Sequence, residues 1–132
     1  MDYRIIVALI IWVVADVFRD KCAEIRVGGY YKAPIPWYYD WQHSFEFGSL
    51  WLPMFVILWA AYGWVVGLGA TMVCGGSWML IYSWATHGNP FAPDEIFLPF
   101  IPDSWGRAEL SGTRFLIIVF TLILGGLFLT FT

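Results

Sequence analysis

The residues best suited to chemistry are acidic side chains and histidines near the ends of apolar segments. They are Asp16, Asp20, Asp40, His43, Glu46 and His87. Carboxylates and imidazoles bind Zn²⁺, Fe or Mn²⁺, and helical bundles build such sites from facing helices. We therefore expect a divalent-metal site whose candidate ligands are Asp16, Asp20, Asp40, His43 and His87. Glu46 and Asp20 are candidate general bases for hydrolysis by a metal-activated water.

The same residues also fit a structural role. Asp16 and Asp20 are one helical turn apart, with Arg19 between them as a partner for an ion pair. The chain contains no HExxH motif, no ExxH pair and no glycine-rich phosphate loop. Two functions remain open: a metal-dependent membrane hydrolase, or a non-catalytic accessory or self-assembling subunit of a membrane complex. Further alternatives are a haem- or chlorophyll-binding protein using His43 or His87, and an ion-conducting oligomer lined by Asp16.

The composition indicates an integral membrane protein. Of the 132 residues, 60% are hydrophobic, 20% are aromatic and only 13% are charged. A typical soluble domain carries about 25% charged residues, so this chain has too few to cover the surface of a water-soluble monomer. The net charge of −3 argues against nucleic acid as a partner. Cys22 and Cys74 form neither a disulfide framework nor a metal motif.

We expect an all-α membrane domain, covering residues 1–132, with four transmembrane helices in two hairpins. The expected spans cover approximately residues 3–22, 47–67, 69–87 and 112–132. The N-terminal apolar run is expected to be a retained helix rather than a signal peptide, because Asp2 and Arg4 cancel in charge and no small-residue cleavage site follows. A unit of this size has little interior, so we expect a homo-oligomer or a larger complex within the lipid bilayer.

The second and third spans form one uncharged run of 37 residues, from 50 to 86. A single helix of that length would measure about 55 Å, far more than a hydrocarbon core of roughly 30 Å. We expect the run to fold back at residues 67–69, where glycines allow a tight turn, with Gly75-Gly76 as the second choice. Pro53 is expected to kink the second helix.

The two long connections, at about residues 23–46 and 88–111, are expected on the same side of the membrane. That side carries six of the seven basic residues, which places the connections in the cytoplasm and both termini on the opposite side. The second connection contains four of the seven prolines around an apolar core. We expect it to form an aromatic and proline-rich cover at the membrane surface. Asp103 is also a candidate start for an extended fourth helix.

Asp16 is expected to lie inside the hydrocarbon core of the membrane. A first span that begins near Tyr3 ends near Cys22, which leaves Asp16 roughly 9 Å inside the loop-side boundary. An intramembrane carboxylate is costly and points to a functional site. Arg19 can neutralise it or extend outward to the surface. Asp40 also fits an N-cap of the second helix.

The third span shows a stripe of small residues that ends at His87. Ser83, Gly76 and Gly69 precede His87 along one helix face. Small residues at this spacing let membrane helices approach closely. We therefore expect both histidines and the candidate carboxylates within about one layer at one face of the membrane.

Overall fold

The computed structural model describes residues 1–27, 45, 47–89, 94–97, 107–110 and 112–132. Its elements, in chain order, are α1 (Tyr3–Val27), the π-helix η1 (Phe47–Trp51), α4 (Leu52–Tyr62), α5 (Trp64–His87), β1 (Asp94–Phe97), β2 (Arg107–Leu110) and α7 (Gly112–Phe131). The expected helical architecture is confirmed, with four α-helices in the described part of the chain. Two of them, α5 and α7, are long and apolar enough to cross a membrane.

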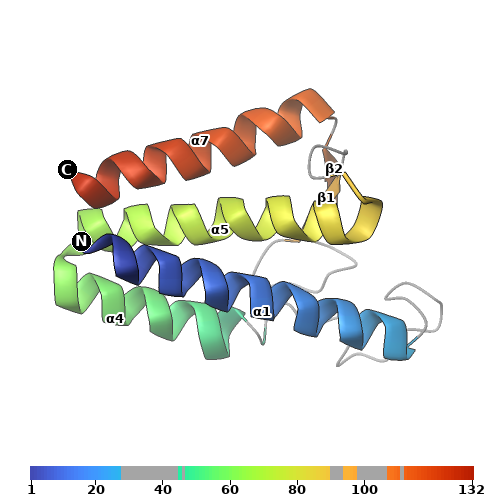
Figure 1. Ribbon diagram of the computed structural model, residues 1–132, viewed down its shortest axis with the longest axis horizontal. Helices are drawn as coiled ribbons and strands as arrows, with labels where there is room; N and C mark the ends of the chain where they lie inside the picture. Colours follow the sequence, from blue (N-terminus) through green and yellow to red (C-terminus); the bar gives the residue numbers. More distant parts are fainter. Residues whose placement is uncertain (28–44, 46, 90–93, 98–106, 111) are drawn as a thin grey trace.

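The helices lie side by side and alternate in direction along the chain (Figure 1). Both termini lie at one end of the molecule, together with the turn between α4 and α5. The C-terminal ends of α1 and α5, the start of α7 and the β1–β2 hairpin lie at the opposite end. We call this second end the hairpin end.

The connection between α5 and α7 contains a short antiparallel hairpin rather than only irregular chain. Its register pairs Asp94 with Leu110 and Phe97 with Arg107. The expectation of an extended fourth helix is wrong, because residues 107–110 form a strand and α7 begins only at Gly112. Asp103 itself lies outside the described residues.

The reversal between the second and third helices occurs at Gly63, not at residues 67–69 as expected. Gly63 has φ 89°, a left-handed conformation that favours glycine, and its N–H donates to the carbonyl of Trp59 at 2.9 Å. Residues 67–69 and Gly75-Gly76 lie inside α5. Pro53 occupies the first turn of α4, directly after the π-helix η1, which ends at Trp51. The kink expected at this proline stays a prediction.

Gly67, Gly69 and Gly76 of α5 serve close packing instead of a turn. A Cβ atom added at Gly69 would lie only 2.7 Å from the carbonyl oxygen of Gly126 in α7. A Cβ added at Gly67 would lie 2.9 Å from the Cα atom of Trp59 in α4. The expected packing face is thereby confirmed, since Gly69, Gly76 and Ser83 are all buried.

Helix α5 is the centre of the bundle. Phe115 and Val119 of α7 are buried, and Gly126 of the same helix packs against Gly69 of α5. A second cluster joins Val13 and Val17 of α1 to residues of α5 and α4, where Trp12 meets Trp51 of η1 edge to face at 4.9 Å. Every described helix therefore contributes to a core built around α5.

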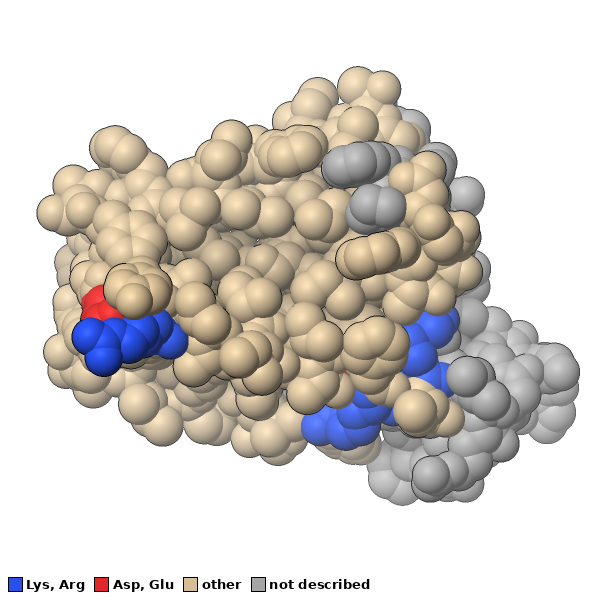
Figure 2. Space-filling model, viewed as in Figure 1, with Lys and Arg blue, Asp and Glu red and all other residues tan. Residues whose placement is uncertain are grey.

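The outside of the bundle is apolar. Large apolar side chains are exposed on each described α-helix, including Ile11 of α1, Ile57 of α4, Trp64 of α5 and Phe128 of α7. On the face shown in Figure 2, charged side chains occur near the end that carries the termini and in the opposite half, with uncharged surface between them. Monomeric soluble proteins rarely expose large apolar patches, so exposed apolar side chains on every described α-helix point to contact with lipid or with another protein.

We predict that Gly69→Ala destabilises the fold, because the added methyl group meets the backbone of Gly126. The expected loss is about 1–3 kcal/mol of unfolding free energy, which is typical of overpacking. Gly75→Ala is the matched control in the same helix, because nothing lies within 4 Å of its Cβ position. It should be neutral or stabilise by up to about 1 kcal/mol. Unfolding in detergent, followed by circular dichroism, compares the two; equal effects would contradict the α5–α7 packing.

Candidate functional site

A polar seam joins α1 to α5 near the hairpin end. We define it as Asp16, Arg19, Asp20 and Lys21 of α1 with Trp78, Tyr82 and Thr86 of α5. Its α1 residues include two carboxylates one helical turn apart. Its α5 residues recur every four positions and therefore share one face of that helix.

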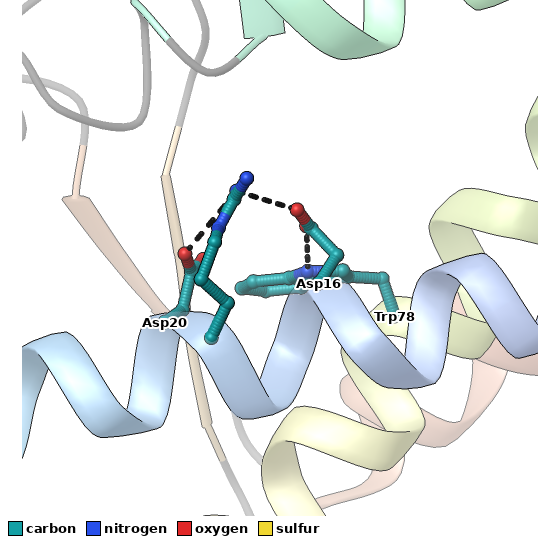
Figure 3. A network of polar contacts seen from close by, with 4 residues as sticks. Asp16, Asp20 and Trp78 are labelled. Carbon is teal, nitrogen blue, oxygen red and sulfur yellow. Dashed lines mark hydrogen bonds and ion pairs between the residues drawn. The ribbon is translucent and has the colours of Figure 1, made fainter.

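Asp16 has hydrogen-bond partners on both helices of the seam. Its side chain is only 3% exposed. One carboxylate oxygen accepts a hydrogen bond from Nη2 of Arg19 at 2.6 Å, and the other accepts one from Nε1 of Trp78 at 3.0 Å (Figure 3). Both oxygens thus have a donor, one from the same helix and one from a helix 62 residues further along the chain. The Asp16 carboxylate therefore neutralises the Arg19 guanidinium and also connects α1 to α5.

Asp20 lies one turn beyond Asp16, and its side chain is 1% exposed. Nη2 of Arg19 is 3.6 Å from its Oδ1 atom, so the guanidinium lies between two carboxylates. The Arg19 side chain is 48% exposed. Arginine suits this position, because it keeps its charge at any physiological pH and offers five N–H donors.

Lys21 makes the second connection between the helices. Its Nζ atom donates to Oγ1 of Thr86 at 3.0 Å and lies 4.9 Å from the ring centre of Tyr82. Tyr82 in turn stacks on Trp78, with ring centres 4.7 Å apart and planes inclined by 11°. The Lys21 ammonium is therefore held by a hydroxyl group and by the face of an aromatic ring.

The two connections set the alignment of the helices. Asp16 meets Trp78, and five residues later Lys21 meets Thr86, eight residues beyond Trp78. Residue numbers therefore increase toward the hairpin end on both α1 and α5. This agrees with Figure 1, in which the two helices run in the same direction. The polar seam occupies the last turns of α5 before His87.

The structure brings some of the predicted site residues together and leaves others open. Asp16 and Asp20 share the seam, and His87 is exposed at the same end of the molecule, as the last residue of α5. Asp40, His43 and Glu46 lie outside the described residues. Within the described ranges, no group of three His, Cys, Asp or Glu residues is arranged to hold a metal ion. The metal site and the general-base roles of Glu46 and Asp20 stay predictions.

Sequence reasoning missed the α5 partners of the seam. Trp78, Tyr82 and Thr86 lie beside the stripe of small residues on the same helix, and the tryptophan and tyrosine resemble residues of an ordinary aromatic belt. Their spacing of four was the available signal, because it places an indole N–H, a ring face and a hydroxyl group along one line.

Comparisons with protein-family models, with curated proteins and with solved structures give no match to this chain. The function is therefore inferred from the polar seam and from the outer surface of the helices.

We predict that Asp16→Asn lowers the unfolding free energy by about 1–3 kcal/mol, because a charged acceptor of two buried hydrogen bonds is lost. Asp2→Asn is the matched control. Asp2 also pairs with an arginine, Arg4, but this pair is exposed, with N and O 3.6 Å apart. Its loss should cost less than about 0.5 kcal/mol. Chemical unfolding in detergent measures both variants, and equal small effects would show that the seam does not stabilise the bundle.

Proposed function

We propose that this chain is an integral membrane protein whose four α-helices all cross the bilayer, and that it acts as a non-catalytic subunit of a membrane assembly. The observation that carries the proposal is that acidic side chains of α1 are buried inside the bundle while large apolar side chains are exposed on its outside. Asp16 and Asp20 turn inward, and both oxygens of Asp16 accept hydrogen bonds from the protein. Large apolar side chains cover the outside.

The dimensions of α5 support this placement. Trp64 and Trp84 stand near its two ends, with exposures of 62% and 60%. Twenty residues separate them, which corresponds to about 30 Å, the thickness of a bilayer's hydrocarbon core. Exposed tryptophan favours the boundary between hydrocarbon and headgroups. With Trp84 at one boundary, Trp78 and its partner Asp16 lie about 9 Å inside it, in agreement with the depth expected from the sequence.

The surface pattern of α7 also fits lipid contact. Ile117, Phe120, Leu124 and Phe128 are exposed along one face, at spacings of three and four residues. The opposite face carries the buried residues that pack in the bundle. A helix of 20 residues measures about 30 Å, enough to cross the hydrocarbon core.

Helix α1 contains several charged residues, but the face that it exposes on the outside of the bundle is mainly apolar. Tyr3, Val7, Ile11 and Phe18 are exposed along one face. The carboxylates lie on the opposite, inward face, and the half-exposed Arg19 can extend toward the headgroups. Lipid would therefore contact α1 mainly through aliphatic and aromatic groups.

The short second helix completes the proposed set of spans. With η1 and α4 taken together it runs from Phe47 to Tyr62, at most about 24 Å. Local thinning of the bilayer accommodates a span that is a few ångströms short. In this arrangement the hairpin end faces the cytoplasm, in keeping with the distribution of basic residues along the chain.

We predict the following labelling by a membrane-impermeant maleimide added outside intact cells. Thr132→Cys, in a Cys22→Ser background, should react from outside. The exposed native Cys22 and an Asn89→Cys variant should react only after the cells are made permeable. Labelling of Cys22 from the same side as Thr132→Cys would overturn the four-span arrangement.

A metal-dependent hydrolase is the second candidate function. The observation in its favour is the nearly complete burial of the Asp20 carboxylate at the end of the molecule that also carries His87. Buried carboxylates beside histidine are typical components of metal centres in helical bundles. The cofactor would be Zn²⁺, Fe or Mn²⁺.

Metal content and particle size separate the two candidates. A structural subunit should be free of stoichiometric metal and elute in mild detergent as a stable assembly of several chains. A metalloprotein should instead contain close to one equivalent of Zn, Fe or Mn that disappears in a His43→Ala, His87→Ala double variant. Elemental analysis coupled to size-exclusion chromatography with light scattering distinguishes these outcomes, and bound metal lost in the double variant would overturn the structural proposal.

A further inference from the structure

Helix α1 has too short an apolar run to cross a bilayer without charged residues. The uncharged stretch from residue 5 to residue 15 covers about 16 Å, roughly half of the hydrocarbon core. A span of about 20 residues must therefore take Asp16, Arg19 and Asp20 below the headgroups. Each such charge is costly for a helix that faces lipid alone.

In the folded bundle, α5 removes much of that cost. Trp78 donates to Asp16, and Thr86 accepts the hydrogen bond from Lys21. Packing against the bundle also leaves the side chains of Asp16 and Asp20 almost completely buried. Trp78 and Thr86 follow their α1 partners by 62 and 65 residues, so a ribosome completes α1 well before they exist.

We propose that α1 crosses the membrane only when it is docked on α5, and that without this contact α1 stays at the cytoplasmic surface, so that the N-terminus is not carried to the outside. The polar seam then decides between two positions of α1. This inference rests on the proposed four-span arrangement and adds a dependence that four independently stable spans would not have.

The test reads the side of the membrane on which the N-terminus lies, through a Tyr3→Cys variant of the full chain in a Cys22→Ser background, because Tyr3 is exposed at the start of α1. The main variant is Trp78→Leu with Thr86→Val, which removes two groups of α5 that hydrogen-bond to α1. Leu68→Ala is the control, because Leu68 lies on the same helix but is exposed and away from the seam. The main variant should lower the fraction of Tyr3→Cys chains labelled from outside intact cells at least about twofold, because the charges of α1 lose their partners and the helix then stays at the cytoplasmic surface. The control should leave that fraction unchanged.

A rescue experiment separates this dependence from general misfolding. Adding Asp16→Leu and Arg19→Leu to the main variant removes two of the charges that need partners, so the Tyr3→Cys thiol should again be labelled from outside. Unchanged labelling in the main variant, or altered labelling that the two leucines do not reverse, would overturn the inference. If the Tyr3→Cys thiol is not labelled from outside even without the substitutions in α5, the four-span proposal itself fails, which is a different outcome.

Discussion

The contact of Asp16 with Arg19 and Trp78 is the interaction on which the arrangement of the bundle depends. A carboxylate in an apolar environment is stable only with hydrogen-bond donors or a counter-charge close by. Arg19 supplies the charge from the same helix, and Trp78 supplies an N–H group from α5. Because the second donor comes from another helix, satisfying the carboxylate also fixes how α1 lies on α5.

The opposite side of α5 depends on shape rather than charge. Gly69 and Gly126 let α5 and α7 approach until the backbone of one helix leaves no room for a side chain on the other. Dispersion contacts between such closely packed backbones are favourable in a membrane, where lipid is as apolar as the helix surface. Helix α5 thus combines a polar face toward α1 with a small-residue face toward α7, which explains its central position.

Much of this arrangement could be predicted from the sequence because it depends on local pattern. Apolar runs located the helices, the three-residue spacing of Asp16 and Arg19 predicted their pairing, and the stripe from Gly69 predicted close packing. The turn at Gly63 could not be predicted in the same way, because several glycines offered the same freedom. Gly69 and Gly67 are recognised as packing positions only through their neighbours in the fold, Gly126 and Trp59. These neighbours are distant in sequence or not marked by any local pattern.

Only the α1 side of the candidate site could be predicted from the sequence. Asp16 and Asp20 attract notice in an apolar chain, whereas Trp78 is one of nine tryptophans, and its role depends on a contact across 62 positions. The β1–β2 hairpin was missed for a related reason, since strand pairing joins residues 94–97 to residues 107–110 across a segment rich in proline.

The most direct test of this account is a double-mutant cycle between Asp16→Asn and Trp78→Phe, measured as unfolding free energy in lipid or mild detergent. The phenylalanine keeps an aromatic ring but removes the N–H donor. A coupling energy of about 0.5–2 kcal/mol is predicted, the range for interacting side chains in membrane bundles. Strictly additive effects would show that the two side chains do not interact, and would contradict the assignment of Asp16 as the residue that joins α1 to α5.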